Sequence, residues 1–119
     1  MIQFYAYDRC GTCRKAEKYL KDRGVEYKKI DITLKPPSVA ILKKILKNND
    51  HLEIKQFRNT SGVDYRSDKI AEKLKILTEM KQLELLASNG RYLKRPILFN
   101  GSRASVGFKD VEKFDQVIS

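Results

Sequence analysis

The chain has no hydrophobic run long enough to cross a membrane. Its longest apolar stretches are only a few residues, whereas a transmembrane helix needs about 20. Residues 1–5 also lack the basic start, apolar core and small-residue cleavage site of a secretory signal. From these absences we expect a cytoplasmic protein that has no membrane partner.

Cysteine and histidine are scarce, with two cysteines and one histidine in 119 residues. A structural zinc ion is usually held by four Cys or His ligands, so one chain cannot supply such a site. A structural disulfide between Cys10 and Cys13 would close a very short loop, which constrains the unfolded chain little. His51 lies in a polar segment, and we expect it to be an ordinary exposed residue.

Acidic residues are few beside basic ones, 15 Asp and Glu against 25 Lys and Arg, which gives a formal net charge of +10. Such a charge attracts anions, including nucleic acids, acidic proteins and oxyanions. The lysines are scattered over predicted helix faces without a dense basic tract, so solubility alone also explains the charge. No predicted helix combines a basic face with base-reading side chains, and we therefore expect no direct binding of nucleic acid.

The length and the 41% hydrophobic content suit one domain, residues 1–119, with its own core. Alternating apolar residues predict strands at 2–7 and 25–32. Between them, helical spacing begins at Thr12 and stops at Gly24. Two strands joined by a helix pair most simply in parallel, with a right-handed crossover.

The middle of the chain is predicted to be mainly helical. We expect about three helices there, capped in turn by Ser38, Ser67 and Thr78. Residues 50–66 are polar and are predicted to be irregular, with Phe57 as their main apolar anchor.

The last third returns to strands. Asn100-Gly101 separates two short apolar runs, which is a strong hairpin signal, and a final helix follows. The order βαβ, helices, ββα predicts an α/β fold with a four-stranded mixed sheet. Its core would lie at about 1–35 and 91–119, with a helical insertion at about 36–90.

Both cysteines belong to one motif, Cys10-Gly11-Thr12-Cys13, where the first predicted strand meets the first predicted helix. The unpaired N–H groups and the dipole of a helix N-terminus would stabilise a thiolate at Cys10 and lower its pKa below the ordinary value of about 8.5. Cys13, further into the helix, could resolve a mixed disulfide formed at Cys10. Small residues at Gly11 and Thr12 leave room for a reaction partner.

Basic residues surround this motif, and Arg9, Arg14 and Lys15 would add to the positive potential at the thiol. The alternative interpretation is a pair of inert, buried thiols. The spacing and the position of the two cysteines favour redox activity.

A second informative place is Lys94-Arg95-Pro96-Ile97. A proline that opens a strand is a candidate for a cis peptide bond, although such bonds are only about 5–6% of X–Pro bonds, and close packing beside a reactive sulfur would give such a bond a purpose. The planar guanidinium of Arg95 suits a thiolate or an oxyanion, and the alternative is a solvated charge at the strand end.

Five segments, at 10–16, 57–62, 85–90, 94–97 and 106–108, occur in the order of the motifs of one protein family. Through them nearly the whole chain resembles the ArsC/Spx family of thioredoxin-like proteins. The resemblance implies a thioredoxin-like sheet with a helical insertion. It also implies that Cys10 is the nucleophile and that Arg95 is the functional arginine before the proline. Thioredoxin-like folds keep a cis proline beside the cysteine motif. Together with the place of Pro96 at the start of a strand, this leads us to predict that the Arg95–Pro96 bond is cis.

The chain departs from the arsenate-reducing branch of this family, which is expected to use three arginines around the oxyanion. Only Arg95 has a clear counterpart, because Arg58 is one position out of register and Val106-Gly107 stands where the third would fall; Arg103 is a poor substitute. That branch typically lacks a cysteine at the position of Cys13 and relies on glutathione and glutaredoxin.

The Spx branch keeps a two-cysteine motif and acts as a redox switch that binds RNA polymerase. The chain is most similar to bacterial members of the family that carry a CxxC pair and a Lys-Arg-Pro-Ile segment. Two functions are therefore predicted.

The first function is thiol–disulfide redox chemistry, with Cys10 as nucleophile, Cys13 as resolving cysteine and Arg95 as a stabiliser of negative charge. Gly11, Thr12, Arg14, Arg58 and Pro96 would support them. Oxyanion reduction linked to glutathione, glutaredoxin or thioredoxin is one form of this function. The alternative is an Spx-like redox-switched transcriptional regulator that binds RNA polymerase. We expect a monomer with no bound cofactor or metal.

Overall fold

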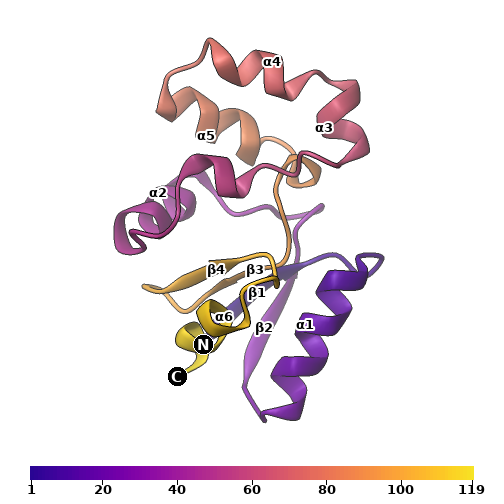
Figure 1. The fold of residues 1–119 in the computed structure, drawn as a ribbon, viewed down its shortest axis with the longest axis vertical. Coiled ribbons are helices and arrows are strands. Elements are labelled where there is room, and N and C mark those ends of the chain that lie inside the picture. The colour runs from indigo at the N-terminus through magenta and orange to yellow at the C-terminus, as the bar shows by residue number, and fades with distance from the viewer.

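A four-stranded sheet is the centre of the computed structural model, which describes all 119 residues. The sheet lies in the lower part of Figure 1, and the middle of the chain extends above it as a group of helices. The strands are β1 (Ile2–Ala6), β2 (Tyr27–Asp31), β3 (Ile97–Phe99) and β4 (Ala104–Val106). The α-helices are α1 (Gly11–Asp22), α2 (Val39–Asn48), α3 (Val63–Ser67), α4 (Ile70–Lys75), α5 (Glu79–Ala87) and α6 (Val111–Ile118). Two short 3-10 helices span Ile54–Phe57 and Gly90–Tyr92.

The strand order is β2-β1-β3-β4, and the sheet is mixed, as predicted. β1 pairs in parallel with β2, with Ile2 opposite Tyr27. β3 pairs antiparallel with both β1 and β4, with Phe4 of β1 opposite Leu98. The βαβ unit and the C-terminal hairpin of the prediction are therefore confirmed.

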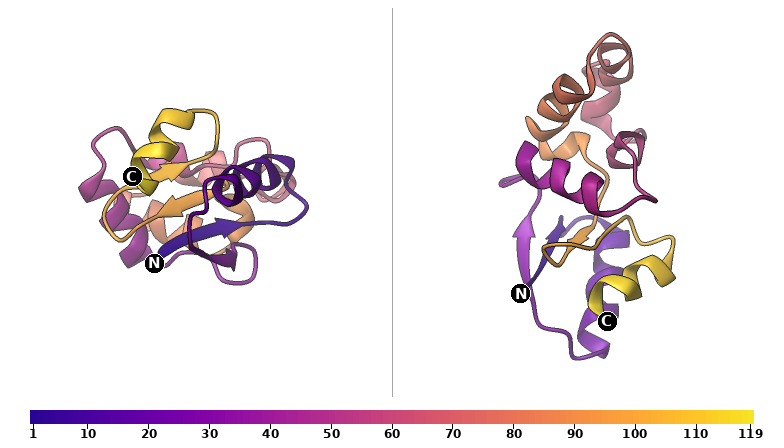
Figure 2. Two further views of the ribbon diagram at one scale, coloured as in Figure 1. Left: turned by 90° about the horizontal axis from the view of Figure 1, so that it is seen from below. Right: turned by 90° about the vertical axis from the view of Figure 1, so that its left-hand side faces the viewer.

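One face of the sheet is covered by α1 and α6, which lie on the same side of it in Figure 2. Phe4 and Ala6 of β1 and Leu98 of β3 point to this side, because alternate residues of a strand face opposite sides of a sheet. They pack against Leu20 of α1 and Phe114 of α6, both fully buried. None of the helices has the length and the apolar character needed to span a bilayer.

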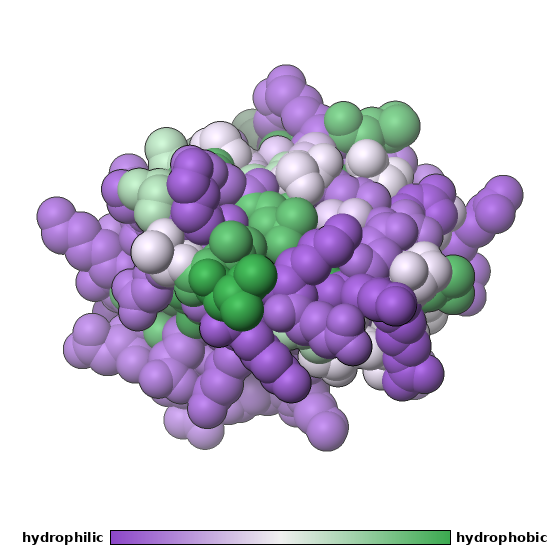
Figure 3. Space-filling view, turned by 90° about the horizontal axis from the view of Figure 1, so that it is seen from above, coloured by the Kyte–Doolittle hydropathy of each residue, from purple (hydrophilic) through white to green (hydrophobic).

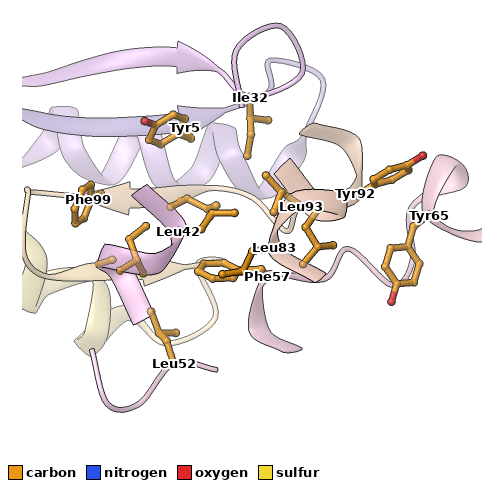
Figure 4. Close-up of a cluster of buried hydrophobic side chains, with 14 of the residues drawn as sticks. Tyr5, Ile32, Leu42, Leu52, Phe57, Tyr65, Leu83, Tyr92, Leu93 and Phe99 are labelled. Carbon is orange, nitrogen blue, oxygen red and sulfur yellow. The ribbon is translucent and has the colours of Figure 1, made fainter. Parts of the chain in front are cut away.

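The other face of the sheet packs against the helical insertion. Figure 4 shows Tyr5 and Phe99 of the sheet on one side of this core, with Leu42 of α2 and Phe57 of the first 3-10 helix facing them. Leu83 of α5 belongs to the same cluster, so the insertion shares its apolar core with the sheet.

The insertion contains more helix than the sequence predicted. The prediction of an irregular 50–66 is wrong, because the first 3-10 helix and α3 lie there. The predicted cap at Ser67 is also wrong, since Ser67 ends α3 and its hydroxyl donates to the carbonyl of Asp64 at 3.4 Å. α4 begins after Lys69, whose φ of 53° breaks the helix. The caps at Ser38 and Thr78 are confirmed by their hydrogen bonds to Ile41 N and Lys81 N.

Gly90 holds the end of the insertion against the sheet. A Cβ atom at this position would lie 1.7 Å from the carbonyl oxygen of Ile32, just beyond β2. This contact is with backbone, which cannot rotate away as a side chain can. Only glycine therefore fits where the chain returns from the insertion toward β3.

We expect Gly90→Ala to destabilise the protein by about 1–3 kcal/mol, because the methyl group must displace backbone in a packed region. Urea unfolding followed by circular dichroism measures this loss. The control is Gly11→Ala in the first turn of α1, where no heavy atom lies within 4 Å of the new methyl group. That variant should be as stable as the parent or slightly more stable, and equal losses in the two variants would contradict the account.

Candidate redox site

Cys10 is the N-cap of α1, at the strand-to-helix turn that the sequence predicted. Its backbone N–H donates to the carbonyl of Tyr7 at 3.0 Å, and its sulfur accepts the N–H of Cys13 at 3.4 Å. The side chain of Cys10 is partly exposed, and its neighbours Gly11 and Thr12 are exposed. The sulfur thus satisfies a free amide of the first helical turn while it remains open to a partner.

Two opposing effects act on the pKa of Cys10. Burial raises it, but hydrogen bonds from the backbone and the thiol of Cys13, the positive charge of Arg95 and the N–H of Thr12 together lower it further than burial raises it. The pKa of Cys10 is therefore lowered, which favours its thiolate form.

Cys13 has the opposite character. It is 3% exposed and packs with Ala16 of α1 in the core beneath the sheet. Burial is the main reason that its pKa is raised to about 12, and the neighbouring Cys10 adds to this effect. Both cysteines are free thiols in this structure. The pair thus combines one accessible, ionisable thiol with one buried, protonated thiol.

The Arg95–Pro96 peptide bond is cis, as predicted. The carbonyl of Pro96 accepts the N–H of Gly107 at 2.7 Å, so the segment before β3 is held by the segment after β4. Because β3 lies beside β1, Arg95 reaches the end of β1, and its Cζ lies 5.2 Å from the ring centroid of Tyr7. The structure thus brings Arg95 to the cysteine turn.

A small pocket of about 120 Å³ adjoins this turn, since Tyr7 and Arg95 both line it. Arg91 lines it too, with its Cζ 5.9 Å from the Tyr7 ring, and Asp64 provides a carboxylate. Nη1 of Arg95 is buried without a hydrogen-bond partner, and none of the six ion pairs in the protein involves these three charged residues. The pocket therefore presents two guanidinium groups that take part in no ion pair, together with the Asp64 carboxylate, which accepts Nδ2 of Asn89 at 3.4 Å.

The sequence did not predict Arg91 as part of the site. It is exposed and belongs to the second 3-10 helix, four residues before Arg95. Arg91 could have been identified from the sequence, because it lies only four residues before the Arg95–Pro96 bond. Its position depends on Gly90, which fixes where the insertion rejoins the sheet.

The other arginines considered in the sequence do not line this pocket. The side chain of Arg58 turns into the insertion, where its Nη2 donates to Gln82 Oε1 at 3.3 Å. Arg14 is exposed on α1, and its backbone N–H donates to the carbonyl of Cys10 at 3.1 Å. Arg103 lies at the C-terminal hairpin and donates to the carbonyl of Gln116 at 3.3 Å. His51 is exposed, as predicted.

An ion-pair network that was not predicted from the sequence contacts the cysteine turn on the β2 side, away from Arg95 and β3. Lys29 of β2 donates to Asp8 at 2.5 Å and to Glu17 of α1 at 3.0 Å. Glu17 also accepts the hydroxyl of Tyr27 at 2.7 Å. These contacts connect the loop before Cys10 to the two elements that follow it.

We expect Cys10 to be alkylated by iodoacetamide with an apparent pKa below that of a free cysteine, whereas Cys13 stays largely unreactive over the same pH range. Arg95→Gln should raise the pKa of Cys10, because a positive charge that favours the thiolate is lost. The pH dependence of the alkylation rate, followed by peptide mass spectrometry, measures both. Arg14→Gln is the matched control, and an equal shift in the two variants would remove the specific role of Arg95.

Comparisons with known proteins place the sequence among proteins of one family. A model of the ArsC family matches residues 5–114. The sequence is 44% identical to the uncharacterized protein YusI of Bacillus subtilis. This match covers 97% of this chain and 96% of YusI. The global transcriptional regulator Spx of Listeria innocua is 28% identical over 94% of this chain and 83% of its own.

Solved structures give the same result. The crystal structure of "a possible arsenate reductase" from Streptococcus mutans superposes with a TM-score of 0.85 and 38% identity, over 97% of this chain and 98% of that one. The predicted thioredoxin-like fold is thereby confirmed, and the relatives support a thiol redox protein. With a family model that covers almost the whole sequence, this chain belongs to the ArsC family.

Proposed function

We propose that this protein carries out thiol–disulfide exchange, with Cys10 as the nucleophile and Cys13 as the resolving cysteine. The observation that carries the proposal is the contrast between the two thiols. Cys10 is partly exposed with a lowered pKa, and Cys13 is buried with a pKa of about 12. This contrast supports an order of reaction in which Cys10 reacts first and Cys13 second.

In the first step, the Cys10 thiolate attacks one sulfur of a substrate disulfide. The substrate S–S bond breaks, a mixed disulfide forms at Cys10, and the other substrate sulfur leaves as a thiolate. In the second step, Cys13 gives up its proton to solvent and attacks the sulfur of Cys10. The second substrate thiolate leaves, so the substrate has gained two electrons and the protein holds a Cys10–Cys13 disulfide.

The charged pocket beside Cys10 supports an anionic substrate. Arg91 and Arg95 outnumber Asp64, neither guanidinium group takes part in an ion pair, and Nη1 of Arg95 has no hydrogen-bond partner. Planar guanidinium groups suit carboxylates and oxyanions. Oxyanion reduction is the specific form of the proposal, with glutathione as co-substrate and glutaredoxin or thioredoxin as the protein that returns the pair to the dithiol.

We expect a mild oxidant to convert the wild-type protein into a form lighter by two hydrogens, as the Cys10–Cys13 disulfide requires. Cys13→Ser should instead accumulate a stable adduct with oxidised glutathione at Cys10, because no second thiol can resolve it. Cys10→Ser should form neither product. Intact-mass spectrometry distinguishes these outcomes, and an adduct on Cys13 in the Cys10→Ser variant at the wild-type rate would contradict the assigned order.

The same preparations test substrate choice. Addition of arsenate with glutathione and glutaredoxin should give arsenite if oxyanion reduction is the activity, and Arg95→Gln should lower that rate by at least about tenfold, the scale of one lost charge-assisted contact. Disulfide reduction without arsenite formation would restrict the proposal to thiol–disulfide exchange.

The second candidate function is redox-switched regulation through RNA polymerase. The relatives named Spx and the net charge of +10 favour it. We expect the immobilised protein to retain RNA polymerase from a bacterial extract in only one of its two redox states, with the Cys10→Ser variant fixed in the reduced behaviour. Equal retention in both states, or none in either, would remove this candidate.

A further inference from the structure

A second, larger pocket lies entirely within the helical insertion and is separate from the cysteine turn. It has a volume of about 440 Å³, and loop 58–60, α3 and the start of α4 form its walls. Figure 3 looks onto the end of the molecule that the insertion forms, whose surface is mostly hydrophilic with several small hydrophobic groups. The residues that line the pocket are Arg58, Thr60, Tyr65, Arg66, Lys69, Ala71 and Glu72.

The charges around this pocket do not cancel. Arg58, Arg66 and Lys69 are positive and Glu72 is negative, which leaves a net +2 on its walls. None of the six ion pairs in the protein uses any of these four residues. The guanidinium of Arg66 is held in place, because its Nε donates to the carbonyl of Thr60 at 3.1 Å. The pocket therefore offers an anion site, and the net charge of +2 on its walls would neutralise a dianion.

Two buried polar atoms without a hydrogen-bond partner belong to residues that line this pocket. They are the hydroxyl of Tyr65, a residue that is 3% exposed, and Nε of Arg58. Tyr92 nearby differs, since its hydroxyl bonds to Asp68 and points the opposite way from that of Tyr65 in Figure 4. Buried donors without partners are costly to a fold, so such atoms call for a specific purpose.

Lys69 adds a strained backbone to the same wall. Its φ of 53° makes it the one residue other than glycine with positive φ in the chain. The left-handed backbone conformation is less favourable for a lysine than for a glycine. Strained backbone of this kind is concentrated at binding sites. Lys69 thus places a flexible positive side chain at the pocket, although its backbone conformation lowers the stability of the protein.

We propose that this pocket binds the phosphate group of a small phosphorylated molecule. A phosphate monoester carries a charge of about −1.5 to −2 at pH 7 and three strong acceptor oxygens. These oxygens would accept hydrogen bonds from Tyr65 Oη and Arg58 Nε, and the charge would match the net +2 of the walls. Glu72 would face the uncharged part of the ligand, where a hydroxyl or an amine could donate to it.

The proposal is tested by titrating the ¹⁵N-labelled protein with inorganic phosphate and, separately, with glycerol 3-phosphate, at constant ionic strength. We expect saturable chemical-shift changes in the amides of residues 58–72 with at least one of these probes, and none with acetate. Arg58→Gln and Tyr65→Phe should each weaken binding by about tenfold or more, since each removes one hydrogen bond to a charged group. The matched controls are Arg103→Gln and Tyr27→Phe, which should bind as the parent does.

Thermal unfolding without phosphate supplies an independent readout. Tyr65→Phe removes an unpartnered buried hydroxyl, and Lys69→Gly relieves the left-handed backbone, so both variants should be at least as stable as the parent while they bind phosphate more weakly. The Cys10→Ser variant should bind normally, so this result does not depend on the proposed redox chemistry. Shifts spread over lysines around the whole molecule, or unchanged affinity in Arg58→Gln and Tyr65→Phe, would overturn the proposal.

Discussion

The antiparallel pairing of β1 with β3 is the contact on which the rest of the site depends. It sets Tyr5 opposite Ile97, so the chain that leaves β1 toward Cys10 lies beside the chain that enters β3 from Arg95. The two segments are about 90 residues apart in sequence. The cis Arg95–Pro96 bond and the capping of α1 by Cys10 then place a positive charge where a thiolate is stabilised.

The insertion is joined to this site by a short backbone contact. Arg58 and Leu93 form an isolated antiparallel bridge, flanked by hydrogen bonds from Lys94 N to Phe57 O at 2.7 Å and from Asn59 N to Tyr92 O at 2.9 Å. Two consecutive residues of this segment line different pockets. Arg58 lines the pocket of the insertion, and Asn59 lines the pocket that contains Arg95. All three buried polar atoms without partners belong to residues that line these two pockets.

Local patterns in the sequence were sufficient to predict the sheet and the cysteine turn, whereas the cis proline was predicted from its place at a strand start together with the family resemblance. The Cys10–Cys13 spacing and the proline ahead of a strand are local signals with a direct physical meaning. Arg91 and the Tyr65 pocket could not be predicted in this way, because they arise from how the insertion folds back onto the sheet. The same reason explains the error at Ser67, where local propensity favoured a cap and the left-handed Lys69 sets the helix boundary instead.

The central claim is that Cys10 and Cys13 form one two-electron redox couple, and equilibration with glutathione redox buffers tests it most directly. Samples quenched with acid and alkylated across a series of reduced-to-oxidised glutathione ratios report the fraction of each thiol that is oxidised. The account predicts that both cysteines are lost together in one transition, as an intramolecular disulfide. Independent loss of Cys10 alone to a glutathione adduct, with Cys13 reduced throughout, would contradict it.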